Sequence, residues 1–345
     1  MSVSYQAVLW NRQKKIYDGV LALGVVLFIG LFIGLGSALF PAATAETLLI
    51  RALGTAAITL LHLILSIGPL ARIDRRFLPL LYNRRHLGVT MFILGLARSA
   101  FAIIQFHAIG DANPLVSVLT SNTNYFSITE FPFQPLGLLA LIIFFFMAAT
   151  SHDFWMANLT PPVWKALHMM VYIAYGLLVA HVVLGVLQSE TSPVLVAFLL
   201  AGFIWITGLH IWSARIEIAK DVEIAEANQE GYINVCHVDD IENFRAHVAT
   251  ISGERVAIWK YGGMVSAISN VCQHQNGPLG EGRIIDGLVT CPWHGFQYKP
   301  EDGSSPEPFT EKIPTFNVKV IDGRILVHPV PNLPGTRVEP AIIEA

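Results

Sequence analysis

The chain has 345 residues, of which 53% are hydrophobic and 14% are charged, and its net charge is −3. Because a typical soluble domain has about 25% charged residues, this composition excludes an ordinary water-soluble protein. The small negative charge argues against a nucleic-acid-binding surface, which needs basic residues to contact phosphates. The chain has three cysteines, too few for a disulfide-rich scaffold. The apolar excess lies in residues 1–214, whereas residues 231–345 have the composition of a soluble domain.

Residues 1–214 contain six apolar segments that can each cross a bilayer as a helix. A membrane-spanning helix needs about 20 residues to cross a hydrocarbon core of about 30 Å. The fourth segment is short, and Arg98 interrupts the third. The first is too long for a secretory signal and lacks its cleavage site, so we expect it to remain in the protein. The six segments are residues 19–40, 52–70, 87–110, 135–150, 166–188 and 193–212.

Lysine and arginine are distributed unevenly among the loops that join these segments. The third and fifth loops contain neither residue, and the first contains only Arg51. Because cytoplasmic loops are enriched in Lys and Arg, this pattern places the N-terminus, the even-numbered loops and the C-terminal domain in the cytoplasm. The sequence thus predicts an integral protein of the inner cell membrane. The basic residues on the cytoplasmic side are Arg12, Lys14, Lys15, Arg72, Arg75, Arg76, Arg84, Arg85, Lys165, Arg215 and Lys220.

Seven histidines lie in or beside the six segments. Ionisable residues are costly inside a bilayer, so each is a functional candidate. Imidazole is a common axial ligand of haem iron, and such sites are built from residues on facing helices. The alternative is that some of these histidines are neutral and only form hydrogen bonds between helices or at the membrane surface. The seven are His62, His86, His107, His152, His168, His181 and His210.

The run Trp164-Lys165-Ala166-Leu167-His168 is followed thirteen positions later by His181. This pattern resembles the ferric reductase-like transmembrane family, which includes NADPH oxidases, metalloreductases and the haem subunit of a bacterial methionine sulfoxide reductase. The resemblance implies one or two b-type haems between the third and fifth helices, with His168 and His181 as axial ligands and electrons crossing the membrane. The other residues that carry the resemblance to this family are Arg84, Arg85, Leu87, Gly88, Thr150, Ser151, His152, Asp153, Leu159 and Tyr172.

Two features of the sequence complicate this implied haem site. Thirteen residues of an ideal helix rise about 20 Å but turn by about 220°, so either the helix is irregular or only one of His168 and His181 is a ligand. The third helix has Arg98 where the family pattern has its histidine. Arginine stays protonated and cannot be an axial ligand. Arg98 is instead a candidate to pair with a haem propionate, the alternative being bonds to backbone carbonyls between helices.

Other histidines are candidates for the missing ligand. His107 is the candidate for the position opposite His181. It lies about 33 Å from the inner end of its helix, whereas His181 lies about 26 Å from the inner end of its own, and helix tilt can reconcile these two depths. For His168, near the inner face, the candidates are His62, His86 and His210.

The second half of the chain has the pattern of a small antiparallel β domain. Short segments rich in Val and Ile alternate with turn pairs such as Gly262-Gly263 and Asp322-Gly323, which is typical of β-hairpins. The expected strands lie at residues 232–238, 255–260, 264–269, 316–320 and 324–327. The predicted division is a membrane domain at 1–214, a helical linker at 215–230, the β domain at 231–330 and an extended Pro-rich tail at 331–345.

Two short motifs in the β domain combine cysteine with histidine. Cys272-Gln273-His274 is separated by sixteen residues from Cys291-Pro292-Trp293-His294-Gly295. Two Cys and two His suit zinc, which is one interpretation. However, each motif supplies one Cys and one His from a glycine-containing loop. A Rieske [2Fe–2S] centre has two Cys on one iron and two His on the other, so this arrangement favours a Rieske centre.

These motifs, with Gln-Asn-Gly-Pro-Leu-Gly after the first and Phe-Gln-Tyr after the second, resemble the Rieske family. They are most similar to its ferredoxin and oxygenase branch. The resemblance implies that Cys272 and Cys291 hold the buried iron and that His274 and His294 hold the exposed iron.

Two residues of the β domain, Cys236 and Phe296, distinguish it from other Rieske branches. Cys236 lies outside both motifs, so the loop disulfide of the respiratory branch is not expected, in agreement with a reducing cytoplasm. Phe296 stands where the high-potential branch has a serine donor, whereas Tyr298 stands at the position of a tyrosine donor. We therefore expect a reduction potential in the lower part of the range of about −150 to +300 mV.

Together these features predict a membrane-bound electron-transfer protein that passes single electrons between a cytoplasmic Rieske cluster and haem b in the membrane. No Gly-x-Gly-x-x-Gly motif follows a predicted strand, so we expect a separate cytoplasmic redox protein as donor or acceptor. Membrane lipid is an expected partner, a quinone or a periplasmic redox protein is a further candidate, and nucleic acid is not expected. No catalytic residue is identified, and the substrate and the direction of electron flow stay open.

Two alternatives come from other classes of protein. In the first, the helices are a haem-free anchor that holds a Rieske ferredoxin near an oxygenase, and Arg98 favours this interpretation. In the second, the chain is a quinol-oxidising subunit of a larger respiratory complex.

Overall fold

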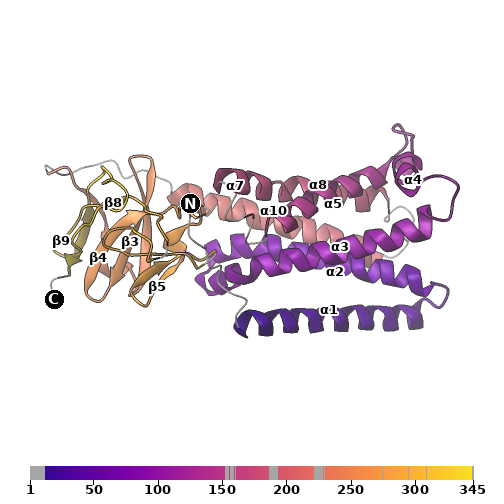
Figure 1. Ribbon diagram of the computed structural model, residues 1–345, viewed down its shortest axis with the longest axis horizontal. Helices are drawn as coiled ribbons and strands as arrows, with labels where there is room; N and C mark the ends of the chain where they lie inside the picture. Colours follow the sequence, from indigo (N-terminus) through magenta and orange to yellow (C-terminus); the bar gives the residue numbers. More distant parts are fainter. Residues whose placement is uncertain are drawn as a thin grey trace.

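A helical bundle and a β domain follow one another along the long axis of the computed structural model (Figure 1). This architecture confirms the predicted fold class, an α-helical membrane bundle followed by a small β domain. The structure describes residues 12–151, Trp155, Leu159, 161–185, 193–220, Asn228, 230–274, 276–293, 295–307 and 309–343.

Within this described part, five helices are long and apolar enough to cross a membrane. The predicted fourth span is a shorter apolar helix, α5 (Phe133–Ala149), of 17 residues. The long elements are α1 (Arg12–Leu39), α2 (Ala45–Ile73), α3 (Arg84–His107), the consecutive pair α7 (Pro161–Met169) and α8 (Val171–Leu184), and α10 (Pro193–Lys220). Shorter elements in the connections are the 3-10 helix η1 (Arg75–Asn83), the helix α4 (Pro114–Thr120) and the 3-10 helix η2 (Ile128–Glu130).

Helix α2 is the central helix of the bundle and packs against α1, α3 and α10. It begins where the Thr44 hydroxyl accepts a hydrogen bond from the Thr47 N–H group. Glu46 in its first turn and Arg72 in its last turn complement the helix dipole. Many apolar side chains on α1 and α10 are exposed, as expected for surfaces that contact lipid. The buried core consists of Leu53, Ala56, Ala57, Leu60, Leu61, Leu65, Met91, Leu94, Ala140, Ile143, Phe144, Ala174, Tyr175 and Ile206.

The predicted fifth span is interrupted at Met170, between α7 and α8. Both of its histidines contact residues at the ends of α5. His168 Nε2 lies 3.5 Å from Ser151 Oγ, just beyond the C-terminal end of α5, and His181 Nδ1 lies 2.8 Å from Phe133 O at its start. An ideal helix would turn these two side chains about 220° apart. The helix is therefore irregular at Met170, between the two predicted ligands.

The β domain contains three small antiparallel sheets. One has the order β1-β10-β9, a second has the order β11-β4-β3-β2 with β8 also paired to β4, and the third has the order β5-β6-β7. The strands are β1 (Ile233–His237), β2 (Arg245–Ile251), β3 (Glu254–Tyr261), β4 (Met264–Ser269), β5 (Arg283–Ile285), β6 (Leu288–Thr290), β7 (Gln297–Tyr298), β8 (Thr315–Phe316), β9 (Val318–Ile321), β10 (Arg324–Val327) and β11 (Ala341–Ile342). Two 3-10 turns, η3 (Val238–Asp240) and η4 (Leu279–Glu281), complete the domain.

Strand β3 is covered on both faces, which explains its continuous apolar sequence. Val256 and Ile258 belong to a core shared with strands β1, β9 and β10. Ala257 and Trp259, which alternate with them, belong to a second core shared with β5, β6 and β7. Because successive side chains of a strand point to opposite faces, a strand between two layers needs apolar residues at every position.

All five expected strand segments contain strands, but the segment at 316–320 is divided. Phe316 belongs to β8, which pairs with β4, whereas Val318 begins β9, which pairs with β10. The Pro-rich tail contributes β11, which pairs with β4 through Ala341 and Val265. In the linker, α10 continues to Lys220, and residues 221–227 lie outside the described part.

Replacing a side chain shared by these layers is expected to destabilise the β domain. Ile258 is fully buried, so Ile258→Ala should lower the free energy of unfolding by about 3 kcal/mol and the melting temperature of the domain by about 15 °C. Differential scanning calorimetry of the full chain in detergent would measure the shift. Ile342→Ala is the matched control, because Ile342 is 71% exposed in β11 and its loss should change little. Equal shifts for the two variants would contradict the layer arrangement.

Candidate site at the junction of the two domains

The two Cys-His motifs occupy two loops of the β domain. Cys272 and His274 follow strand β4 and precede η4, whereas Cys291 lies between β6 and β7. Both cysteines are almost completely buried in the core beneath β5, β6 and β7. His294 lies outside the described residues, and among those described no group of three or more His, Cys, Asp or Glu side chains is placed to hold a metal ion.

The two loops have the same backbone hydrogen bonds at the same spacing. In the first, Cys272 N–H donates to Gly277 O at 3.0 Å and Asn276 N–H donates to Cys272 O at 2.7 Å. In the second, Cys291 N–H donates to Phe296 O at 2.8 Å and Gly295 N–H donates to Cys291 O at 3.0 Å. Asn276 and Gly295, each four residues after the cysteine, both have a positive φ angle. The two motifs are therefore structurally equivalent turns, each with a cysteine at its base.

The two loops also face one another. A Cβ atom on Gly277, in the first loop, would lie only 2.7 Å from Cys291 Sγ in the second, so this position has no space for a side chain. The His274 ring stacks on the Phe296 ring with 5.1 Å between centroids. Phe296, which stands in place of the serine donor, thus packs beneath a predicted histidine ligand.

Tyr298 places its hydroxyl between the backbone of the first loop and a cysteine. Gln273 N–H donates to Tyr298 Oη at 2.9 Å, and Cys272 Sγ lies 3.5 Å from the same oxygen. Because the oxygen already accepts the amide proton, its own O–H is available to donate to Cys272 Sγ. Burial, followed by the charge of Cys272, raises the pKa of the Tyr298 phenol. The hydroxyl therefore remains protonated and can act as a donor.

No disulfide joins the three cysteines, all of which are described. Cys236 lies in β1, and burial together with Asp240 raises the pKa of its thiol to about 11. A thiol with so high a pKa is unreactive near neutral pH, because the thiolate is the nucleophile. Cys236 is thus a structural residue of the strand.

Three histidines of the bundle have a ring nitrogen next to a backbone carbonyl oxygen. His168 Nδ1 lies 3.0 Å from Trp164 O, His181 Nδ1 lies 2.8 Å from Phe133 O, and His210 Nδ1 lies 2.9 Å from Ile206 O. Since a carbonyl only accepts, each Nδ1 carries the proton and each Nε2 has a lone pair. Histidines that ligate metals almost always donate their other N–H in this way.

His181 is the most completely enclosed of these three. Its side chain is 7% exposed, and Nε2 is buried without a hydrogen-bond partner among the described residues. Gly137 of α5 allows the ring to lie this close, because a Cβ atom there would be 2.6 Å from Nδ1. An unpartnered buried nitrogen costs about 1–3 kcal/mol, so it indicates that a ligand belongs at this position.

The other candidate histidines form side-chain contacts. His62 Nε2 lies 3.1 Å from the Tyr175 hydroxyl, and His107 Nδ1 lies 2.9 Å from Ser117 Oγ in α4. His86 Nδ1 lies 2.7 Å from a carboxylate oxygen of Asp18 in α1. His152 and Asp153 lie outside the described residues.

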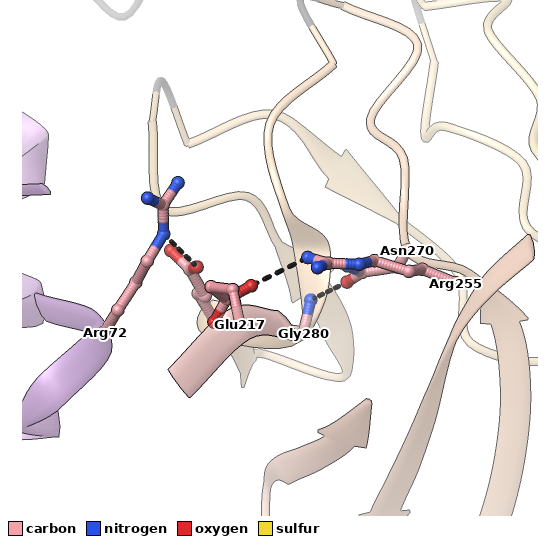
Figure 2. Close-up of polar contacts among 6 residues, drawn as sticks. Arg72, Glu217, Arg255, Asn270 and Gly280 are labelled. Atoms are coloured by element: carbon pink, nitrogen blue, oxygen red, sulfur yellow. Dashed lines mark hydrogen bonds and ion pairs between the residues drawn. The ribbon is translucent and has the colours of Figure 1, made fainter. Parts of the chain in front are cut away.

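Among the described residues, ion pairs that connect the β domain with the bundle include one from α2 and one to α10. Arg72, at the end of α2, approaches Glu281 of η4 at 3.7 Å, and Arg255 of β3 donates to Glu217 of α10 at 2.8 Å. Figure 2 shows that the contacts converge beside the η4 turn, where Gly280 N–H donates to Asn270 Oδ1 at 2.7 Å. The turn that follows the first Cys-His loop is therefore held against the bundle.

A third contact connects the second Cys-His loop with the bundle. Trp293, two residues after Cys291, has the guanidinium of Arg84 5.9 Å from its ring centroid. Arg84 is the first residue of α3. Trp293 thus connects the second cysteine loop with the start of α3 in the bundle.

Comparisons with known proteins assign both halves of the chain. Residues 53–179 match the ferric reductase like transmembrane component, and residues 231–317 match the Rieske [2Fe-2S] domain. The chain is 32% identical over 108 residues to the ferredoxin component of the alkene monooxygenase system of Xanthobacter autotrophicus, covering 31% of this chain and 88% of that protein. It is 30% identical over 174 residues to the heme-binding subunit MsrQ of the protein-methionine-sulfoxide reductase of Caulobacter vibrioides, covering 50% of this chain and 75% of that protein. The chain belongs to both families.

Both resemblances stated from the sequence are therefore confirmed, and the fused chain is a membrane electron-transfer protein with a Rieske domain. A solved structure that matches is the ferredoxin of carbazole 1,9a-dioxygenase from Nocardioides aromaticivorans IC177. It is 24% identical, has a TM-score of 0.28, and is matched over 29% of this chain and 98% of that chain.

Several residues of this Rieske–ferric reductase junction were not singled out from the sequence. Trp293 was part of the quoted Cys-Pro-Trp-His-Gly motif, and Arg84 was part of the family-like Arg-Arg run, but no sequence signal pairs them. Away from the junction, Gly137 of α5 was also not singled out, and it matters only because the ring of His181 approaches it from a distant part of the chain.

Removing both ion pairs is expected to loosen the Rieske domain from the bundle. Each partly exposed pair contributes about 0.2–1 kcal/mol, so Arg72→Gln combined with Arg255→Gln should raise hydrogen exchange of the η4 amides by about fivefold. Hydrogen-exchange mass spectrometry of the full chain in nanodiscs would measure this, and high salt should act in the same direction. Arg337→Gln is the control, because it removes only a local pair with Glu339. Unchanged exchange in the double variant would contradict this interface.

Proposed function

We propose that this protein conducts single electrons between a Rieske cluster on the cytoplasmic side and haem b in the membrane. The contact of the Trp293 ring with Arg84, which joins a cysteine loop of the Rieske domain to the first residue of α3 in the ferric reductase-like bundle, carries the proposal. When bound, the cluster and the haem each supply reversible one-electron chemistry. The residues of the chain hold these groups, orient them and exclude water from the region between them.

Cys272, Cys291, His274 and His294 are the proposed cluster ligands. The equivalent turns with a cysteine at each base, and the lack of space for a side chain at Gly277, support this assignment. The two cysteines are deeply buried, whereas His274 is partly exposed, as expected if thiolates hold an inner iron and imidazoles an outer one. Zinc is the alternative occupant, and acid-labile sulfide distinguishes the two.

His168 and His181 are the proposed haem ligands. Their carbonyl-bonded Nδ1 atoms, and the unpartnered Nε2 of His181, support this choice over His62, whose Nε2 lies beside the Tyr175 hydroxyl. The contact of His107 with Ser117 is through Nδ1 and does not occupy its Nε2, so His107 stays a candidate. The rings lie near opposite ends of α5, which fits one haem near each membrane face or a single haem bound by one of them. His210 also has the favourable tautomer and lies beside Tyr172, with 5.4 Å between centroids, so it is a candidate partner for His168.

The basic loops orient the proposed conduit, with α10 entering the cytoplasm and the Rieske domain docked on that face. Electrons then enter from, or leave to, a separate cytoplasmic redox protein. The relatives include a monooxygenase ferredoxin and a haem-binding reductase subunit, which supports electron carriage but assigns neither substrate nor direction.

Quantifying iron, acid-labile sulfide and haem in one purified sample tests the conduit. We expect all three, with a b-type α-band in the reduced-minus-oxidised spectrum. His168→Ala and His181→Ala should each reduce haem content and leave iron–sulfide content unchanged, because imidazole is lost only from the bundle. His107→Ala and His62→Ala test the remaining candidates, and His237→Ala, in the β domain, is the control.

Two outcomes of this measurement would contradict the proposal. Sulfide without haem in the unmodified protein would leave an anchored ferredoxin, and zinc without sulfide would remove the Rieske assignment. Full haem content in both His168→Ala and His181→Ala would show that other residues bind the haem.

Removing the Tyr298 hydroxyl is expected to lower the reduction potential of the cluster. A hydrogen bond to a thiolate ligand favours the more negative reduced form, so Tyr298→Phe should lower the potential by about 50 mV, equivalent to about 1 kcal/mol. A redox titration followed by EPR would measure the shift. Tyr261→Phe is the matched control, since that hydroxyl contacts Ser266 Oγ at 2.7 Å rather than a cysteine. An unchanged potential in Tyr298→Phe would exclude this hydrogen bond as a determinant.

A further inference from the structure

The outer part of the bundle contains buried polar atoms that the described residues do not satisfy. His181 is only 7% exposed, and its buried Nε2 atom has no hydrogen-bond partner among the described residues. Gln134, next in the chain to the Phe133 carbonyl that accepts from His181, has a buried Oε1 that also lacks a partner. Such unsatisfied buried groups are uncommon in folded proteins, and the unpartnered Nε2 of His181 is the nitrogen available to a ligand.

Contacts between α3 and α5 show which residue of α3 lies at the level of His181. The Phe92 and Phe145 rings are 6.1 Å apart, and the next contact outward joins Gly95 to Leu141. Because the two helices are antiparallel, one further turn brings Arg98 level with Gly137, the residue against which His181 packs. Arg98 and His181 therefore lie at one depth in the bundle.

The other histidines described in the bundle are displaced from this level or engaged elsewhere. His107 is nine residues further along α3, about 13 Å outward, and contacts Ser117. His62 contacts Tyr175, which lies six residues before His181 on α8, about 9 Å inward. Neither is placed to serve as the second axial ligand opposite His181.

Arg98 itself has no ion pair with a carboxylate among the described residues. It packs against Gly54 of α2, where a Cβ atom would lie 3.1 Å from Nε. A cation inside the membrane is costly without a counter-charge or a polar partner. A guanidinium cannot ligate iron, but it donates to anionic groups at a fixed angle.

We propose that the outer site binds haem through His181 alone, so that the second axial position is open to a small exogenous ligand beside Arg98. This rests on the proposed function, because it requires haem at this level. The ligands that fit are diatomic molecules such as carbon monoxide on the ferrous form and small anions such as cyanide on the ferric form. Arg98 would favour the anions through its charge. The site is thus a ligand-binding centre and not only an electron carrier.

The test uses the full-length protein in nanodiscs, with haem content measured on each sample. We expect the oxidised protein to show a high-spin haem signal by EPR, and the reduced protein to give a carbon monoxide difference spectrum. His181→Ala should abolish both signals. Low-spin haem that is inert to carbon monoxide in the unmodified protein would overturn this proposal and leave the conduit intact. A sample without haem would overturn both.

Two substitutions at Arg98 sharpen the test. Arg98→His supplies an imidazole at the level of His181, so it should convert the haem to low spin and suppress carbon monoxide binding. Arg98→Gln, the matched control, removes the charge without adding a ligand, so high-spin haem and carbon monoxide binding should persist while cyanide affinity falls by about tenfold. Loss of the carbon monoxide spectrum in Arg98→Gln at full haem content would contradict the open position. The measurements on the unmodified protein decide the proposal even if Arg98→His fails to fold.

Discussion

Histidines that ligate metals almost always donate the proton of the other ring nitrogen, and in this bundle a backbone carbonyl accepts that proton from three histidines. Within a bilayer a polar group has no water to bond, so each imidazole must find its acceptor inside the protein. His168 and His210 use the carbonyl four residues earlier in the same helix, whereas His181 uses Phe133 on a different helix. The position of α5 therefore determines the orientation of the most buried imidazole.

The junction between the two families gives the fusion its physical meaning. A Rieske domain joined only by a linker would meet the bundle by diffusion, whereas here two ion pairs and the Arg84–Trp293 contact hold both cysteine-bearing loops against the helix ends. The ion pairs are individually weak. Because the linker already confines the domain, modest contacts are enough to favour one docked arrangement.

Much of the architecture follows from local patterns in the chain. The apolar segments predicted the helices, and the Gly-rich turn pairs with alternating strands predicted the β domain, because these signals depend on neighbours a few residues apart. The division at Asn317, where one predicted strand becomes β8 and β9 in different sheets, could not be predicted, since it depends on which distant strand each half pairs with. The pairing of the tail strand β11 with β4 depends on the same kind of long-range contact.

By itself, the sequence determined the chemistry that is available: two cysteines, the histidines of the two motifs, the histidines of the bundle, and Arg98 where the family pattern has an imidazole. Only the tertiary structure decided how these groups are presented. The span is interrupted at Met170, His168 and His181 contact opposite ends of α5, and Arg98 packs against Gly54 of α2. Residue types are a local property of the chain, but rotation about a helix axis and depth in a bundle are set by packing between helices.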